Sequence, residues 1–313
     1  MDFFNTILNW VVPSASLVIL AFAWPTPVFP QYLEKLVRVP NNRDDHSNGT
    51  LLLLPVRQML RFQIAYEYAK RRTNLVLVAR REQRLRVVSE NARLMGAKHV
   101  TFIAANVVEE DDCRRFVNET INSYGRLDHL VNTASMEHAF YFEEVIDTSC
   151  ILFSDLGPFF LPDINFWGNV YPTYASLPYL HLSNGRIVVN AAVETWLTLP
   201  RMSLYAATKA ALVNFYDTLR FEVKDDVGIT IATHGRIGCA DMQWKEEREE
   251  YARLIVSGAC RGDAYVKCPS WYDICLLFRF FAPNVLNWTL RLLLETHGAR
   301  TTLVPLLDQN GKN

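Results

Sequence analysis

The chain has 313 residues, half of them hydrophobic, which is enough for one large α/β domain with extensions. Lys and Arg together number 32 and Asp and Glu 33, so the formal net charge is −1. This balance, with no basic stripe and no zinc-binding spacing, argues against a nucleic-acid partner and gives no reason to expect a metal site. The six cysteines form no CxxC pair and are typical of reduced thiols in a cytosol-facing protein.

The N-terminal segment is unusual because Phe3 to Leu33 contains no charged residue. It is long enough to enter a bilayer, but its prolines interrupt any single straight helix. A cleaved signal peptide fits poorly, since the segment lacks a basic start. We therefore predict a hydrophobic, proline-containing membrane anchor over residues 1–38, as a hairpin or a monotopic element. The alternative is a buried N-terminal helix.

After a polar loop, strands and helices alternate as a doubly wound parallel α/β sheet requires. The predicted strands are Thr50–Leu54, Asn74–Ala79, His99–Ala105, a fourth beginning at Leu130, Gly185–Val193 and Gly228–His234. The predicted helices are Gln58–Arg72, a basic helix ending near Met95, Glu109–Tyr124, about Asp163–His181, Tyr205–Val223 and Glu246–Ile255.

The stretch from Trp271 to Leu294 is rich in aromatic residues and leucine, with Pro283 in its middle. Three roles remain open for it: a dimer face, an element that contacts a membrane, or a cover for the sheet.

Tyr205 and Lys209 are four residues apart in a predicted helix and so share one of its faces. A lysine ammonium there lowers the pKa of a phenol, which is about 10 when unperturbed. The pair is therefore a candidate acid/base.

Several strings around this pair resemble the plant 11-beta-hydroxysteroid dehydrogenase-like proteins, the steroleosin group of short-chain dehydrogenases. They include Leu77-Val78-Ala79-Arg80-Arg81-Glu82, Gly125-Arg126-Leu127-Asp128-His129-Leu130-Val131-Asn132, Asn165-Phe166-Trp167-Gly168 and Gly258-Ala259-Cys260-Arg261-Gly262. The similarity runs from about Gly49 to the region of Trp288. It implies a Rossmann-like dehydrogenase domain over residues 39–262, between the anchor and an aromatic-rich extension over residues 263–313.

The resemblance also implies a function. Members of this group use NADP(H) to interconvert a hydroxyl and a ketone on a sterol-like substrate. They reside on endoplasmic reticulum or lipid-droplet membranes, here with the catalytic domain facing the cytosol, and a homodimer is possible.

Individual residues match the group's functional positions. Tyr205 matches the proton donor and acceptor, Lys209 the residue that lowers its pKa and holds the nicotinamide ribose, and Asn165 the residue that completes the proton relay. In the cofactor site, Arg80 matches the arginine for the 2′-phosphate of NADP. Asn132 matches the first Asn of the Asn-Asn-Ala-Gly motif, and Asn106 replaces an aspartate that contacts adenine.

Other positions depart from the family pattern. Ala192 stands in place of the serine that hydrogen-bonds the substrate oxygen, and Thr195 is a possible replacement. Pro55, Met59 and Arg61 occupy the glycine positions of the phosphate-binding turn, where Arg57 and Arg61 offer charge instead.

Two further differences concern the end of the sixth strand and the substrate lid. His234 replaces the proline of a Thr-Pro-Gly motif and is interpreted as a packing or surface residue. Most of the segment that covers the substrate in the family is missing after Gly235, whereas Cys150 to Pro162 is an additional stretch.

Two interpretations follow. The first is a membrane-anchored, NADP-linked, hydroxysteroid dehydrogenase-like oxidoreductase. The second is a catalytically impaired pseudoenzyme, or a structural protein of lipid-droplet or endoplasmic-reticulum membranes, that has lost the dinucleotide cradle.

Overall fold

The computed structural model describes residues 49–54, 59–136, 162–224, 226–235, 244–268, 276, 278–279 and 281–295. The predicted anchor over residues 1–38 and the turn position Pro55 lie outside these ranges. Within them, no helix combines the length and the hydropathy that crossing a membrane requires.

In the described chain, seven parallel strands form one sheet in the order β3-β2-β1-β4-β5-β6-β7. They are β1 (Thr50–Leu54), β2 (Asn74–Ala79), β3 (His99–Ala104), β4 (His129–Asn132), β5 (Arg186–Ala192), β6 (Gly228–His234) and β7 (Tyr265–Cys268). The strand order reverses between β1 and β4, which confirms the predicted doubly wound, Rossmann-like sheet. Strand β7 is an addition, since the sequence predicts six strands.

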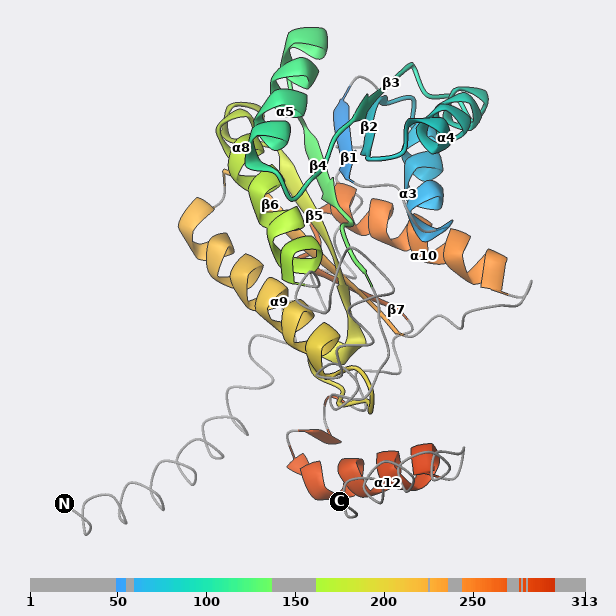
Figure 1. The fold of residues 1–313 in the computed structure, drawn as a ribbon, viewed down its shortest axis with the longest axis vertical. Coiled ribbons are helices and arrows are strands. Elements are labelled where there is room, and N and C mark those ends of the chain that lie inside the picture. Colours follow the sequence, from blue (N-terminus) through green and yellow to red (C-terminus); the bar gives the residue numbers. More distant parts are fainter. Residues whose placement is uncertain are drawn as a thin grey trace, which may run out of the picture. The chain divides into compact units, whose positions relative to one another are not determined.

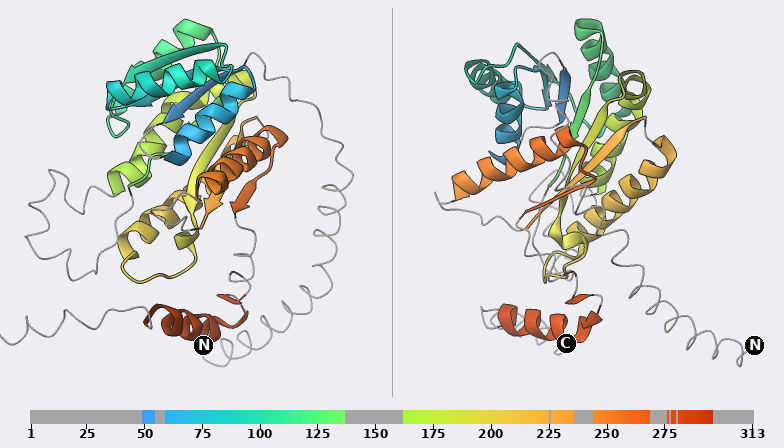
Figure 2. Two further views of the ribbon diagram at one scale, coloured as in Figure 1. Left: turned by 90° about the vertical axis from the view of Figure 1, so that its right-hand side faces the viewer. Right: turned by 180° about the vertical axis from the view of Figure 1, so that it is seen from behind.

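Helices cover both faces of the sheet (Figure 1). On one face lie α3 (Met59–Lys70), α4 (Glu82–Leu94) and α10 (Trp244–Arg261). On the other lie α5 (Glu110–Tyr124), α8 (Gly168–Ser183) and α9 (Ser203–Val223). Figure 2 shows these two layers from the side and from behind.

The central strands are mostly apolar because both of their faces are buried. In β2, every residue from Leu75 to Ala79 is buried. Val76 and Val78 pack in the core that includes Phe116 of α5, whereas Leu75 and Leu77 pack with Ile64 of α3. The alternation assigns each strand residue to one of two cores.

Two shorter features complete the described chain. A π-helix (Asp163–Trp167) leads directly into α8, and it forms the start of the helix predicted from Asp163. Near the C-terminus, α12 (Pro283–Glu295) begins with a proline, which suits the first position of a helix.

Candidate active site

Helix α9 places Tyr205 and Lys209 one turn apart at the end of β5. Both are buried, with Tyr205 3 % and Lys209 0 % exposed. The Lys209 ammonium donates a hydrogen bond of 3.0 Å to the backbone carbonyl of Asn190 in β5, and its Nζ lies 6.0 Å from the centroid of the Tyr205 ring. A fully buried ammonium needs such a partner, so β5 holds the lysine beside the tyrosine.

Ala192, the last residue of β5, packs in a small buried cluster with Tyr205 and Met202. The predicted position of the missing serine is therefore in contact with the tyrosine, as the family pattern requires. An alanine methyl group supplies no hydrogen-bond donor. Thr195 lies beyond it, at the end of a short 3-10 turn, and is half-buried.

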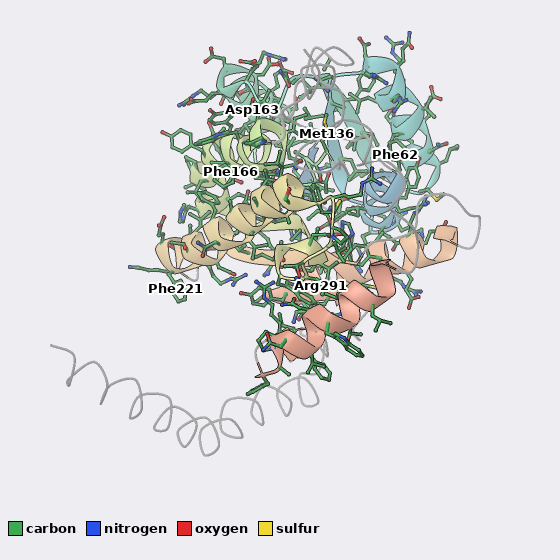
Figure 3. The ribbon with its side chains drawn as sticks, turned by 60° about the horizontal axis from the view of Figure 1, so that its bottom comes forward. Phe62, Met136, Asp163, Phe166, Phe221 and Arg291 are labelled. Atoms are coloured by element: carbon green, nitrogen blue, oxygen red, sulfur yellow. The ribbon has the colours of Figure 1, made fainter. Side chains whose placement is uncertain are left out.

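Asn165 is fully buried and ties the loop after β4 to α9. Its Oδ1 accepts the Met136 backbone N–H at 2.6 Å, and its Nδ2 donates to the Met136 carbonyl at 3.1 Å and to Thr208 Oγ1 at 3.0 Å. Figure 3 labels Met136 together with Asp163 and Phe166 of the π-helix that carries Asn165. Single turns of π-helix often occur at functional sites, and this one brings the predicted relay residue up to the catalytic helix.

The predicted cofactor residues lie at the same edge of the sheet, because the carboxyl ends of parallel strands meet there. Arg80 follows β2 and is exposed, Asn106 follows β3 and is half-buried, and Asn132 ends β4. The backbone N–H of Asn106 donates a 2.7 Å hydrogen bond to Asp112 Oδ2. Their contacts with a cofactor remain predictions.

The Asn132 side chain lies in a buried polar network between the sheet and helices α8 and α9. Its Nδ2 is 2.8 Å from Thr173 Oγ1, 2.8 Å from Tyr216 Oη and 3.1 Å from the Asn169 carbonyl. Burial raises the pKa of the Tyr216 phenol, which therefore stays neutral and serves as a hydrogen-bonding group.

The positions of the phosphate-binding turn are only partly described. Met59 is the first residue of α3 and Arg61 lies in its first turn, but their side chains are outside the described part of the chain, as is Pro55.

His234 ends β6, beside the predicted serine position at the end of β5. In the sheet its Cα pairs with those of Ala192 on one side and Cys268 on the other. Its Nδ1 is 2.9 Å from the Gly235 carbonyl, which only accepts, so Nδ1 carries the proton. Its Nε2, 3.4 Å from Asn190 Nδ2, then accepts. In the sequence, the histidine in place of the proline of the Thr-Pro-Gly motif was the feature that pointed to this position.

His234 also faces Tyr251 of α10, whose ring packs edge-on against it with centroids 5.8 Å apart. Within the described chain, the Asn190 Oδ1 and Tyr251 Oη atoms are buried and have no hydrogen-bond partner. Asn190, whose backbone carbonyl holds Lys209, thus also has a buried side-chain oxygen that the described protein leaves unsatisfied.

The short chain dehydrogenase family model matches residues 59–251, more than half of the chain. The chain belongs to the short-chain dehydrogenase family. It is therefore an oxidoreductase by family, and the match begins after β1, downstream of Pro55.

Similar curated proteins place it in the plant hydroxysteroid dehydrogenase-like group of this family. It is 58 % identical to 11-beta-hydroxysteroid dehydrogenase B of Arachis hypogaea, over 96 % of this chain and 89 % of that protein. It is 57 % identical to 11-beta-hydroxysteroid dehydrogenase-like 5 of Arabidopsis thaliana, over 96 % of this chain and 81 % of that protein. The predicted resemblance is confirmed.

Solved structures agree on the fold. A short-chain dehydrogenase/reductase of Burkholderia phymatum in complex with NAD gives a TM-score of 0.64 at 16 % identity, covering 76 % of this chain and 95 % of that one. An alcohol dehydrogenase of Thermococcus sibiricus, complexed with 5-hydroxy-NADP, gives 0.60 at 18 % identity, covering 70 % and 94 %.

Proposed function

We propose that the protein is a membrane-anchored, NADP(H)-linked hydroxysteroid dehydrogenase-like oxidoreductase that interconverts a hydroxyl and a ketone on a sterol-like substrate. The observation that carries this proposal is the buried Tyr205 and Lys209 pair against the end of β5. The names of the relatives that are 57–58 % identical support the substrate class.

The residues of the chain have separate roles in the proposed reaction. When bound, a nicotinamide supplies or accepts hydride at the carbinol carbon. Tyr205 gives its phenolic proton to the substrate oxygen during reduction and takes it back during oxidation. The Lys209 ammonium stabilises the phenolate form of Tyr205, and Asn165 fixes α9 through Thr208.

The described residues fit a nicotinamide dinucleotide at its nicotinamide end, where Lys209 lies beside Tyr205 and donates to the backbone carbonyl of Asn190. The side-chain Oδ1 of Asn190 is buried there without a hydrogen-bond partner. The preference for NADP(H) rests on Arg80. It is exposed and directly follows β2, and Arg81 beside it is exposed as well. An arginine at this point accommodates the 2′-phosphate, whereas an acidic residue binds the free ribose hydroxyls of NAD.

The membrane association is assigned to residues 1–38, because Phe3 to Leu33 is uncharged. The proposed location is the endoplasmic reticulum or a lipid droplet, with the catalytic domain on the cytosolic side, and a homodimer is the proposed assembly. Deleting residues 1–33 should move the protein from the membrane pellet to the soluble fraction. A deletion variant that stays in the pellet would contradict this assignment.

Turnover of a hydroxysteroid with NADP⁺ tests the reaction. The full chain in detergent should oxidise the substrate, and Tyr205→Phe should lower the rate about 100- to 10,000-fold because the proton transfer is lost. Tyr174→Phe, an exposed tyrosine of α8, is the matched control and should keep full activity. Equal rates for the wild type and Tyr205→Phe would refute the proposed chemistry.

A further inference from the structure

Helix α12 exposes large apolar side chains along one of its faces. Val285, Trp288 and Leu292 follow one another at intervals of three and four residues, so they form one stripe on the helix. They are 51, 65 and 48 % exposed. Phe278 and Phe281, just before the helix, are exposed too. A monomeric soluble domain rarely exposes so many large apolar groups in one short segment.

The rest of α12 is arranged as in a helix at an interface. Asn284, Asn287 and Arg291 are exposed and form a narrow polar stripe at the same intervals. Arg291 is labelled on α12 in Figure 3. Leu286 and Leu290, on the remaining side, are half-buried. Thr289, beside Val285, is exposed too, and its Oγ1 donates to the Val285 carbonyl. The apolar sector is thus wider than the polar one, and the charged residues of α12 are Arg291 and Glu295.

The charged side chains whose exposure is described in this segment are basic. They are Arg279 and Arg291, both exposed, whereas the acidic residue of α12 is its last, Glu295. Basic residues beside an apolar sector with Trp and Phe are the composition of helices that lie at lipid headgroups.

Length also separates the possible occupants. The 13 residues of α12 span about 20 Å at about 1.5 Å per residue. This is shorter than the roughly 30 Å hydrocarbon core of a bilayer, and it covers fewer than the three to four heptads that roughly define a stable coiled coil. Lying flat on a lipid surface requires neither length.

We propose that α12 is a second membrane contact. Its Val285, Trp288 and Leu292 stripe enters the boundary between headgroups and acyl chains of an anionic phospholipid layer, while Arg291 meets the headgroups. The inference rests on the membrane association proposed above, because a protein held at a membrane meets a lipid surface. It adds a contact at the opposite end of the chain.

A face-resolved fluorescence measurement on the full chain separates the two contacts. An environment-sensitive fluorescent amino acid replaces Val285 in one variant and Asn287 in its matched control. Both are mixed with vesicles of phosphatidylcholine and phosphatidylserine, and flotation reports membrane association independently. We expect emission from position 285 to shift to shorter wavelengths with vesicles, and emission from position 287 to stay unchanged. Adding Trp288→Asn to the position-285 variant should raise the lipid concentration that gives half of the shift roughly 10-fold or more, because less apolar surface is buried in lipid.

Each other outcome overturns the inference in its own way. If the protein floats with vesicles but position 285 does not shift, α12 is outside the lipid and only the N-terminal proposal survives. If position 285 is shifted without vesicles and the shift grows with protein concentration, the occupant is a second copy. A shift without vesicles at every concentration means that the chain's own residues cover the stripe. If the protein neither floats nor shifts, both membrane proposals fail.

Discussion

At the scale of single residues, the site has the tyrosine and lysine needed for proton transfer but lacks the serine that would hydrogen-bond the substrate oxygen. Tyr205 and Lys209 are buried together and β5 holds the ammonium. The position next to the tyrosine carries the methyl group of Ala192. A donor aimed at the substrate oxygen contributes about 100- to 1,000-fold to such rates. The wild-type protein is therefore expected to be a slow enzyme.

Ala192→Ser should raise kcat by about 100-fold or more, because it restores that donor beside Tyr205. The measurement is steady-state turnover of a hydroxysteroid. Ala191→Ser is the matched control, since Ala191 packs in the core on the opposite face of the sheet, and it should leave kcat unchanged. Equal effects from the two variants would show that the serine position does not limit the rate.

The spacing of Tyr205 and Lys209 predicted that they share one helix face because helical periodicity is a local property, whereas Asn165 was predicted from the family resemblance. The structure links Asn165 to the same helix through Thr208. The sequence could not predict the hydrogen-bond network around Asn132, since its partners Thr173 and Tyr216 lie on two different helices. The contact between His234 and Asn190 also needs the register between β5 and β6, which composition does not specify.

Tyr216→Phe should destabilise the protein by about 1 kcal/mol, because it removes the hydroxyl that accepts from Asn132 Nδ2 and donates to the Asn169 carbonyl. Urea unfolding followed by circular dichroism measures the difference. Tyr174→Phe, at the exposed surface of α8, should change stability by less than about 0.5 kcal/mol. A similar result for both variants would mean that the network contributes little.

At the scale of elements, α10 approaches β7 closely because Gly258 has no side chain. A Cβ at this position would overlap Val266 Cγ2 of β7. The same helix packs Tyr251, Ile255 and Val256 in the core on this face of the sheet. The glycine thus allows α10 to cover β7, the four-residue strand that the sequence did not predict.

Gly258→Ala should lower the free energy of unfolding by about 1–3 kcal/mol through overpacking against Val266. Adding Val266→Ala should recover part of that loss, because it removes the methyl group that clashes. Thermal or urea unfolding of the two single variants and the double variant gives the coupling. Additive losses would rule out a close contact between these two residues.

The loop after β3, which carries Asn106, is held by the first turn of α5. The hydrogen bond from the Asn106 N–H lowers the pKa of Asp112, burial partly opposes this, and Arg115 adds a smaller lowering. A lowered folded pKa means that the stabilisation is present above the pKa of the unfolded chain and is lost as the pH falls through the folded pKa.

Asp112→Asn should therefore cost less than about 1 kcal/mol at neutral pH, since the carboxylate is partly exposed to solvent. The difference from wild type should close in acid below about pH 4. Stability measured against pH tests this, with the neighbouring, exposed Asp111→Asn as control. A gap between wild type and Asp112→Asn that persists in acid would show that Asp112 acts through packing rather than charge.

The type of an element was predictable where its pattern of apolar residues was clear and turn residues bounded it, as in β2 and α5. The helix α12 was not predicted, and two further features were missed for physical reasons. The π-helix before α8 forms through the tertiary hydrogen bonds of Asn165, and β7 has only four residues, one of them a lysine. Neither feature produces a clear periodic pattern of apolar residues in the sequence.

At the scale of the whole molecule, a short-chain dehydrogenase fold carries an intact catalytic pair, altered cofactor and substrate-oxygen positions and, in our proposals, two membrane contacts. The Rossmann-like sheet and the alignment of strand ends bring Arg80, Asn106, Asn132 and Tyr205 to one edge. Activity of the whole protein then depends on whether this edge still binds a dinucleotide with Pro55, Met59 and Arg61 in the glycine positions.

Titration of the full chain in detergent with NADPH by isothermal calorimetry is the most direct test of the central claim. We predict binding in the micromolar range, tighter for NADPH than for NADH, with Arg80→Glu removing that preference. Circular dichroism on the same sample confirms folding. A folded protein that binds neither dinucleotide would contradict the proposed oxidoreductase.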